Sequence, residues 1–161
     1  MNEMLFNLDD FTDFDAVKEQ STNGCYDACR IGDICESQFA LDAKLQGFEI
    51  FRPDGHATKA DIIIRKPGGR PIMIQIKKSH HHNGTWRVKA FSSAGGKNTT
   101  YKIGDFDVLA GYVRHYKKWI FLHLHQFDTH FYSWKPNNGQ PIDNWEIFDQ
   151  YFTTPYDRIP D

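Results

Sequence analysis

The sequence predicts an α/β protein in which helices pack on a β-sheet. Two observations carry this prediction. A helical pattern ends in the first third of the chain, and short β-branched runs follow it, with further helical patterns among them. The 161 residues are 40% hydrophobic and 15% aromatic, which suits one folded domain with a substantial core. We expect this domain to span residues 25–161, after an acidic arm over residues 1–24.

The first predicted helix covers residues 27–46. Gly47 is placed to end it, since glycine is common directly after the last helical residue. Gly32 weakens the helix and marks the point at which it is most easily divided. Two stripes run along it at helical spacing: an apolar stripe of Ile34, Leu41 and Leu45, and a small-residue stripe of Glu36, Ala40, Ala43 and Gly47. The small residues would let the helix lie close to the sheet.

The rest of the chain divides into short segments. Predicted strands cover residues 48–51, 61–65, 72–77, 86–91, 118–125 and 129–134; predicted helices cover residues 105–113 and 144–152; residues 92–100 are predicted as loop. In the strand at 61–65, Ile62, Ile63 and Ile64 are apolar on both faces, which indicates a central strand covered on both sides.

Three polar groups stand at one end of an otherwise apolar hairpin. Gln75 and Lys77 share a face of their strand because side chains alternate. Residues paired across an antiparallel hairpin share a face, and their residue numbers have a constant sum. Asp61 shares the face of Gln75 and Lys77 only if that sum is even, whereas a tight Gly68-Gly69 turn gives an odd sum. Prolines on both sides of the glycines disfavour that tight turn, so we expect a longer loop or a bulge that brings the three groups together.

An acid followed across a hairpin by an acid-like residue and a lysine is the pattern of metal-dependent phosphodiester cleavage. The acid binds a hard divalent cation, which lowers the pKa of a bound water and offsets charge on the phosphate. The lysine stabilises the oxyanion that develops. The run GDICESQFALDAKLQGFEIFRPDGHATKADIII…IMIQIKKS resembles the PD-(D/E)XK nuclease superfamily. The resemblance is closest to small endonucleases that include intron-encoded homing enzymes, with archaeal Holliday-junction resolvases as more distant relatives.

The resemblance covers residues 31 to about 125 and implies a restriction-endonuclease-like core, a central mixed β-sheet flanked by helices. It implies four catalytic residues: Glu36, Asp61, Gln75 and Lys77. It implies Mg²⁺ as cofactor, replaceable by Mn²⁺, held by Asp61, Glu36, Gln75 and the backbone carbonyl of Ile76. Gln75 stands where the common motif has an acid, so Glu36 is expected to supply the second carboxylate. Ala60 stands where the motif has proline.

Charge is unevenly distributed along a chain of net charge −2. Residues 1–24 hold six acids and one base, whereas residues 51–120 hold fourteen Lys/Arg against four Asp. A basic middle suits a polyanion, although an ordinary solvated surface gives the same composition. The predicted DNA contacts are Lys78, His80, Arg87, Lys89, Lys97 and Lys102. Residues 80–82, three histidines, are interpreted as a loop that meets phosphate or as a plain surface loop.

Several other residues carry weaker signals. Cys25, Cys29 and Cys35 are odd in number and lack an evident fourth ligand, which favours idle or buried thiols over zinc. Asp105 is expected to cap the helix at 105–113. Tyr101 and Asp107 match the pattern of the resembling group and are expected to position a basic loop rather than bind metal. His123 and His125 are expected to line a solvated strand face.

Two functional readings follow. The first is a Mg²⁺-dependent DNA endonuclease of the homing, restriction or junction-resolving type, acting as a homodimer or higher homo-oligomer. The second is a catalytically weak or inactive DNA-binding protein that keeps the nuclease fold. A further hypothesis is that the acidic arm covers the basic face until a partner displaces it. The chain has no run of about 18 apolar residues and no basic, apolar N-terminal signal, so we expect no membrane partner and a cytoplasmic location.

Overall fold

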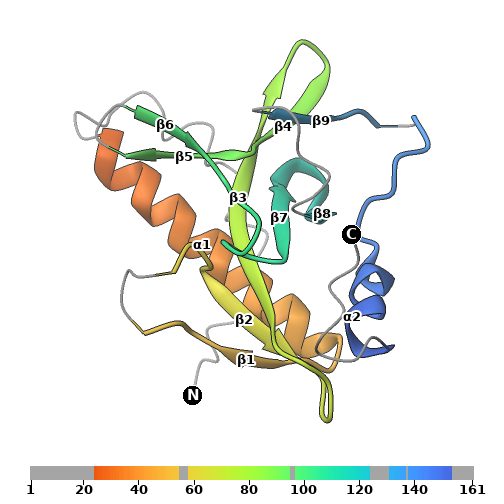
Figure 1. Ribbon diagram of the computed structural model, residues 1–161. Helices are drawn as coiled ribbons and strands as arrows, with labels where there is room; N and C mark the ends of the chain where they lie inside the picture. The colour runs from red at the N-terminus through yellow and green to blue at the C-terminus, as the bar shows by residue number, and fades with distance from the viewer. Residues whose placement is uncertain (1–23, 55–57, 95–96, 124–130, 137, 154–161) are drawn as a thin grey trace, which may run out of the picture.

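The computed structural model describes residues 24–54, 58–94, 97–123, 131–136 and 138–153 (Figure 1). The helices are α1 (Gly24–Leu45), η3 (Arg114–Tyr116), η5 (Trp145–Phe148) and α2 (Gln150–Thr153). The strands are β1 (Glu49–Phe51), β2 (Ile62–Arg65), β3 (Ile72–His82), β4 (Thr85–Lys89), β5 (Phe91–Ala94), β6 (Lys97–Thr100), β7 (Val108–Val113), β8 (Lys118–His123) and β9 (Phe131–Trp134). Apart from Gly24, the predicted acidic arm lies outside the described residues.

Helix α1 runs without a break through Gly32 and ends before Gly47, whose φ of +83° confirms the predicted stop. The predicted apolar stripe is wrong, because Ile34, Leu41 and Leu45 are 42%, 54% and 76% exposed. The face that packs on the sheet instead carries Cys35, Phe39 and Ala43, all buried at four-residue spacing. Phe39 decides this orientation, since its ring packs edge-on against Trp119 at 5.1 Å.

The main sheet is mixed and is organised around β3 (Figure 1). On one edge, β3 pairs antiparallel with β2 near its start and with β4 near its end. On the other edge it pairs parallel with β7, which pairs antiparallel with β8. Strands β1 and β9 extend the sheet beyond β2 and β4. The predicted strands at 48–51 and 61–65 are therefore confirmed as β1 and β2. β2 has a neighbouring strand on each edge, as predicted. Only one of its faces is fully buried, because Ile62 and Ile64 are buried and Ile63 on the other face is half-buried.

The prediction of a helix over residues 105–113 is wrong: residues 108–113 form strand β7. Every residue of β7 is buried, because it lies between β3 and β8 with a core on each face. Such a strand shows no alternation of apolar and polar residues, and its short apolar run cannot be told from a buried helix by periodicity. Asp105 consequently caps no helix; its carboxylate accepts from Lys102 N–H at 2.8 Å within a turn.

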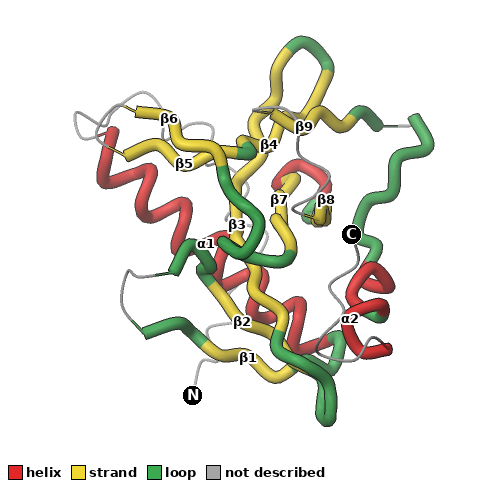
Figure 2. The backbone as a smooth tube through the Cα atoms, viewed as in Figure 1, coloured by secondary structure: helices red, strands yellow, loops and turns green. Residues whose placement is uncertain are grey.

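Two segments predicted as loop are strands. The histidines at 80–82 form the end of β3 and pair with β4. Residues 91–94 and 97–100 form a two-stranded sheet of their own, β5–β6, which Figure 2 shows as a separate ribbon. The apolar signal is weak in both segments, and pairing with the neighbouring strand along the chain decided the conformation.

Two cores lie on opposite faces of the sheet. The α1 face also carries η5 and α2, so the predicted C-terminal helix is confirmed as a 3₁₀ turn followed by an α-helical turn. The opposite core includes Tyr101 and Phe106 from the segment that joins β6 to β7. Among the described residues, no helix has the length and apolar character needed to cross a membrane.

Candidate active site

The hairpin register confirms the prediction that three polar groups converge. Ile62 lies opposite Ile74, and Ile63 opposite Met73, so the numbers of each pair add to an even number. The connection spans residues 66–71 and is closed by Gly69 N–H donating to the Lys66 carbonyl at 2.9 Å. This register sets Asp61 beside Gln75 at the start of β2, as the longer loop requires.

The site lies at a fork in the sheet. On one edge of β3, β2 pairs with residues 72–74 and β4 with residues 79–82. In the part of the chain that the structure describes, neither strand pairs with the segment between, residues 75–78, on that edge. Strand β7 holds the same segment in place from the other edge. Backbone N–H and C=O groups of residues 75–78 on that edge are therefore available to side chains, while pairing with β7 keeps the segment in the sheet.

Asp61 fills the fork with its carboxylate. Its backbone N–H donates to the Ile74 carbonyl at 2.8 Å, and its Oδ2 accepts from Ile76 N–H at 2.7 Å. The carboxylate thus continues the ladder where β2 ends. Gln75, which is 5% exposed, donates from Nε2 to the same Oδ2 and to the Ile76 carbonyl at 3.3 Å. One amide nitrogen therefore joins a carboxylate oxygen to a backbone carbonyl oxygen.

Lys77 lies on the same face of β3 as Gln75, two residues further along. Its Nζ lies 5.9 Å from the centre of the Tyr101 ring, which is buried in the core of that face. Burial lowers the pKa of Lys77, the charges of Asp61 and Glu36 oppose that change, and those of Lys89 and Lys59 reinforce it. Lys77 is therefore within electrostatic reach of both acids of the predicted set.

Glu36 approaches from α1. Its carboxylate is 26% exposed and accepts from Arg52 at 3.0 Å, an ion pair with the loop after β1. Its negative charge nonetheless acts on the pKa of both Asp61 and Lys77. The structure thus joins Asp61, Gln75 and Ile76 by hydrogen bonds. Lys77 and Glu36 act on Asp61 through their charges, and Glu36 is held by Arg52.

Burial raises the pKa of Asp61 from 3.8 to about 6, against the lowering effects of the Ile76 N–H and of Lys77. The carboxylate is therefore costly to ionise even with the positive charge of Lys77 nearby. Within the described ranges, no three His, Cys, Asp or Glu side chains gather as a metal-binding group. The oxygens at the fork are instead those of the Asp61 carboxylate and the Ile76 carbonyl, with the Gln75 amide nitrogen between them.

Four of the predicted DNA contacts share one face of the β3–β4 hairpin. His80 lies directly opposite Arg87, and the same register sets Lys78 and Lys89 beside that pair. Burial and then the charges of Lys89 and Arg87 lower the pKa of His80, as expected from this register. We call Lys78, His80, Arg87 and Lys89 the cationic face.

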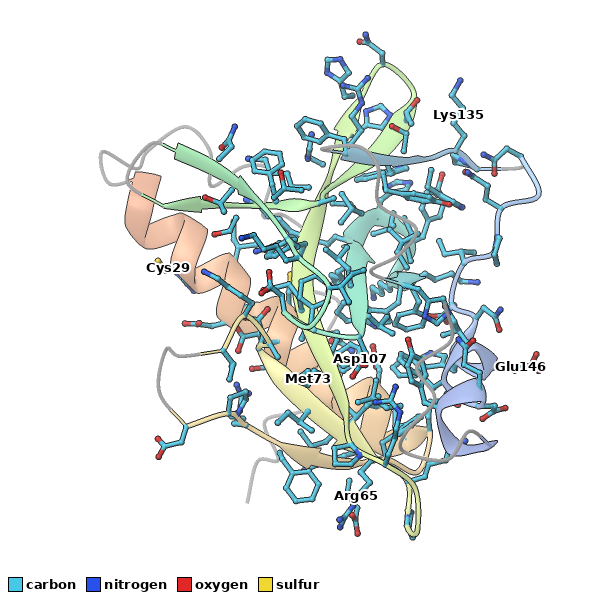
Figure 3. The ribbon with its side chains drawn as sticks, viewed as in Figure 1. Cys29, Arg65, Met73, Asp107, Lys135 and Glu146 are labelled. Atoms are coloured by element: carbon cyan, nitrogen blue, oxygen red, sulfur yellow. The ribbon has the colours of Figure 1, made fainter. Side chains whose placement is uncertain are left out.

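The other predicted contacts lie elsewhere. Lys97 opens β6, and Lys102 is exposed in the turn after β6. The sequence analysis did not select Lys59, whose charge lowers the pKa of Lys77. Its position two residues before Asp61 could have indicated that it lies near the site. Asp107 is structural: its carboxylate accepts from Met73 N–H at 2.8 Å and from Arg70 at 3.2 Å, joining the starts of β3 and β7 (Figure 3).

The predicted solvated face for His123 is wrong. His123 is 7% exposed, and its two ring nitrogens contact Tyr151 Oη and Gln150 Nε2, so the C-terminal helix covers it. His125 lies outside the described residues. Of the cysteines, Cys29 is an exposed free thiol and Cys35 a buried one, whose pKa burial raises to about 11.

Comparison with known proteins accords with this geometry. Among solved structures, the chain is similar to that of a bacterial homing endonuclease, I-Ssp6803I, with a TM-score of 0.64 and 17% sequence identity over 74% of this chain and 90% of that chain. This likeness shows the fold and confirms the predicted restriction-endonuclease-like architecture. No match was found among curated proteins. A family model described as PD-(D/E)XK endonuclease matches residues 26–145, most of the chain, and the protein therefore belongs to the PD-(D/E)XK endonuclease family.

Proposed function

We propose that this protein is a DNA endonuclease that requires a divalent cation, Mg²⁺ with Mn²⁺ as a substitute. The observation that carries the proposal is the meeting of the Asp61 carboxylate, the Gln75 amide and the Ile76 carbonyl at the fork of the sheet, with Lys77 on the same face as Gln75. Family membership supports the nuclease assignment, and the likeness to a homing endonuclease fold favours DNA as the substrate.

The donors at the fork fit a hard divalent cation, which prefers carboxylate and carbonyl oxygens. Gln75 Nε2 now joins the Asp61 and Ile76 oxygens. Turning the amide over presents Oε1 beside them in its place. The proposed ligands are Asp61, Gln75, the carbonyl of Ile76 and Glu36, whose pair with Arg52 is exposed and therefore weak. When bound, the cation lowers the pKa of a coordinated water and offsets charge on the scissile phosphate.

The chain's own groups have separate proposed roles. The hydrogen bond from Ile76 N–H holds the Asp61 carboxylate in one orientation, so little side-chain entropy is lost when a ligand binds. Lys77 places a positive charge where the attacked phosphate gains negative charge, in a half-buried position where that charge counts for more than in water. Gln75 carries no charge, so Glu36 supplies the second carboxylate of the set.

The cationic face is proposed to bind the DNA backbone. It is continuous with the site through β3, because Lys77 and Lys78 are adjacent. Alternation along the strand separates their roles: Lys77 points to the face of Gln75, and Lys78 to the face of His80. One chain carries one site, so cleavage of both strands requires at least two copies, which we propose as a homodimer or higher homo-oligomer.

This separation provides a matched test. Supercoiled plasmid, four-way junction and linear duplex are incubated with Mg²⁺ and with wild type, Lys77→Met or Lys78→Met. We expect Lys77→Met to lower the cleavage rate by at least about 100-fold with DNA affinity retained. Lys78→Met, the neighbour on the other face, is expected to weaken binding but to keep turnover at saturating DNA.

Three outcomes contradict the proposal. Equal cutting by wild type and Lys77→Met would indicate a contaminating nuclease. Activity retained in excess EDTA would exclude the cation requirement. Binding by wild type without cutting of any substrate would favour the second reading, a DNA-binding protein that keeps the fold, which the neutral Gln75 makes a serious alternative.

A further inference from the structure

The β5–β6 ribbon stands outside the seven-stranded sheet. Its two strands pair only with each other in the described residues, with Phe91 opposite Thr100 and Ser92 opposite Thr99. In Figure 1 the ribbon extends away from β3 and β4. A two-stranded ribbon on its own is only marginally stable in water, so a ribbon outside the main sheet is a candidate for contact with a binding partner.

The described side chains of the ribbon beyond its first residue are small and polar. Asn98, Thr99 and Thr100 are exposed, and Ser92 is half-buried. Hydroxyl groups both donate and accept hydrogen bonds, so they suit a partner that presents mixed donors and acceptors. This composition differs from the cationic face of the β3–β4 hairpin, whose positive charges suit the phosphates of the DNA backbone.

The base of the ribbon is fixed beside the candidate active site. Phe91 is 6% exposed and packs edge-on against Phe131 at 5.4 Å. Tyr101 follows directly after β6, and its ring is the one that lies 5.9 Å from Lys77 Nζ. Whatever the ribbon contacts therefore lies close to the bond that Lys77 acts on.

We propose that the β5–β6 ribbon lies in the major groove of the substrate DNA and that Ser92 and Thr99 contact base edges there. The proposal rests on the DNA endonuclease function proposed above. The major groove, about 12 Å wide, admits a two-stranded ribbon, and serine and threonine hydroxyls contact the base edges exposed in it. These two residues share the face opposite Phe91, and the Phe91 ring on the other face packs against Phe131 of β9.

The length of the ribbon limits which base pairs it reaches. Four residues of strand span roughly 13 Å, which corresponds to about four base pairs at about 3.4 Å each. Because the ribbon starts beside Lys77, the bases it contacts fall within about four to five pairs of the cleaved bond. Phosphate contacts by the cationic face carry no such positional information.

Two adjacent threonines allow a matched experiment. Thr99 and Thr100 are both exposed in β6 and point to opposite faces of the ribbon. Thr99→Val and Thr100→Val each remove one hydroxyl while keeping a β-branched side chain of similar shape. A duplex library with randomised positions is incubated with each variant and Mg²⁺, and the bound and cleaved fractions are sequenced.

We expect Thr99→Val to reduce base discrimination by about 5- to 10-fold at one or two adjacent positions within about five pairs of the cut. Thr100→Val is expected to keep the wild-type preference within twofold. The inference is overturned if both variants or neither change the preference, if only Thr100→Val does, or if wild type cuts with no preference near the bond. Failure of wild type to bind or cut any duplex would instead remove the endonuclease proposal, and this inference with it.

Discussion

At the scale of single residues, the polar groups of the fork depend on one another. Gln75 is 5% exposed and is held by the Asp61 carboxylate and the Ile76 carbonyl, so its amide is satisfied only while both oxygens are in place. Asp61 in turn keeps a negative charge in a half-buried position, where burial raises its pKa to about 6. Such a group lowers the stability of the folded protein, and groups with pKa values shifted in this way are common at active sites.

Asp61→Asn is expected to stabilise the cation-free protein at pH 7.5. The folded-state pKa of Asp61 lies above its usual value, so the folded protein binds this proton more tightly than the unfolded chain. The cost of ionisation is fully present above pH 6 and disappears as the pH falls below 4. Because the pKa is raised by about two units, removing the charge can increase the free energy of unfolding by at most about 3 kcal/mol. Loss of carboxylate hydrogen bonds in the variant reduces this increase to about 1–2 kcal/mol.

Urea unfolding in EDTA at pH 7.5 and at pH 4 measures this gain. It should be present at the higher pH and near zero at the lower one. Asp54→Asn, a change to an exposed acid in the loop after β1, serves as control and should leave stability within about 0.5 kcal/mol at both pH values. A destabilised Asp61→Asn at pH 7.5, or a gain independent of pH, would contradict the assigned burial cost.

At the scale of elements, two glycines illustrate opposite uses of a missing side chain. Gly32 lies within α1, and a Cβ there would meet no atom within 4 Å. Gly111 lies in β7, where a Cβ would overlap the side chain of Val88, which is fully buried. β4 therefore packs closely over β7 because residue 111 is glycine, whereas α1 tolerates Gly32 without needing it.

Gly32→Ala is accordingly expected to raise the free energy of unfolding by about 0.5–1 kcal/mol, since alanine restricts the unfolded chain and favours the helix. Gly111→Ala is expected to lower it by about 1–3 kcal/mol through overpacking. Denaturant unfolding of both variants checks the two signs. Adding Val88→Ala to Gly111→Ala tests the cause: the cost of the pair should be less than the sum of the single costs, and simple additivity would exclude the overlap.

At the scale of the whole molecule, charge is arranged around the fork. Lys78, His80, Arg87 and Lys89 lie together on the hairpin that continues β3 beyond the site. A duplex bound to this face releases counterions, so affinity is expected to depend on salt in proportion to the phosphates neutralised. This is the property that separates a DNA-binding surface from an ordinary charged one.

Lys89→Ala is expected to weaken DNA binding about equally for all sequences and to reduce the slope of log affinity against log salt by about 1. Lys135→Ala, a change in the segment after β9, is the control and should leave the slope unchanged. Fluorescence anisotropy at several salt concentrations measures both. A slope for Lys89→Ala equal to that of wild type would remove this residue from the DNA interface.

The sequence alone determined α1 and its stop at Gly47, the strands β1, β2 and β8, the hairpin register and the convergence of Asp61, Gln75 and Lys77. These follow from local signals: a helix end, apolar runs of strand length, and two prolines that exclude a tight turn. Only the tertiary structure decided that residues 108–113 form a strand, that residues 91–94 and 97–100 form a ribbon and that Phe39 turns α1 toward the sheet. Pairing with β3 decided the strand at 108–113, pairing of β5 with β6 decided the ribbon, and packing of Phe39 against Trp119 decided the orientation of α1. None of these contacts leaves a periodic pattern in the residues themselves.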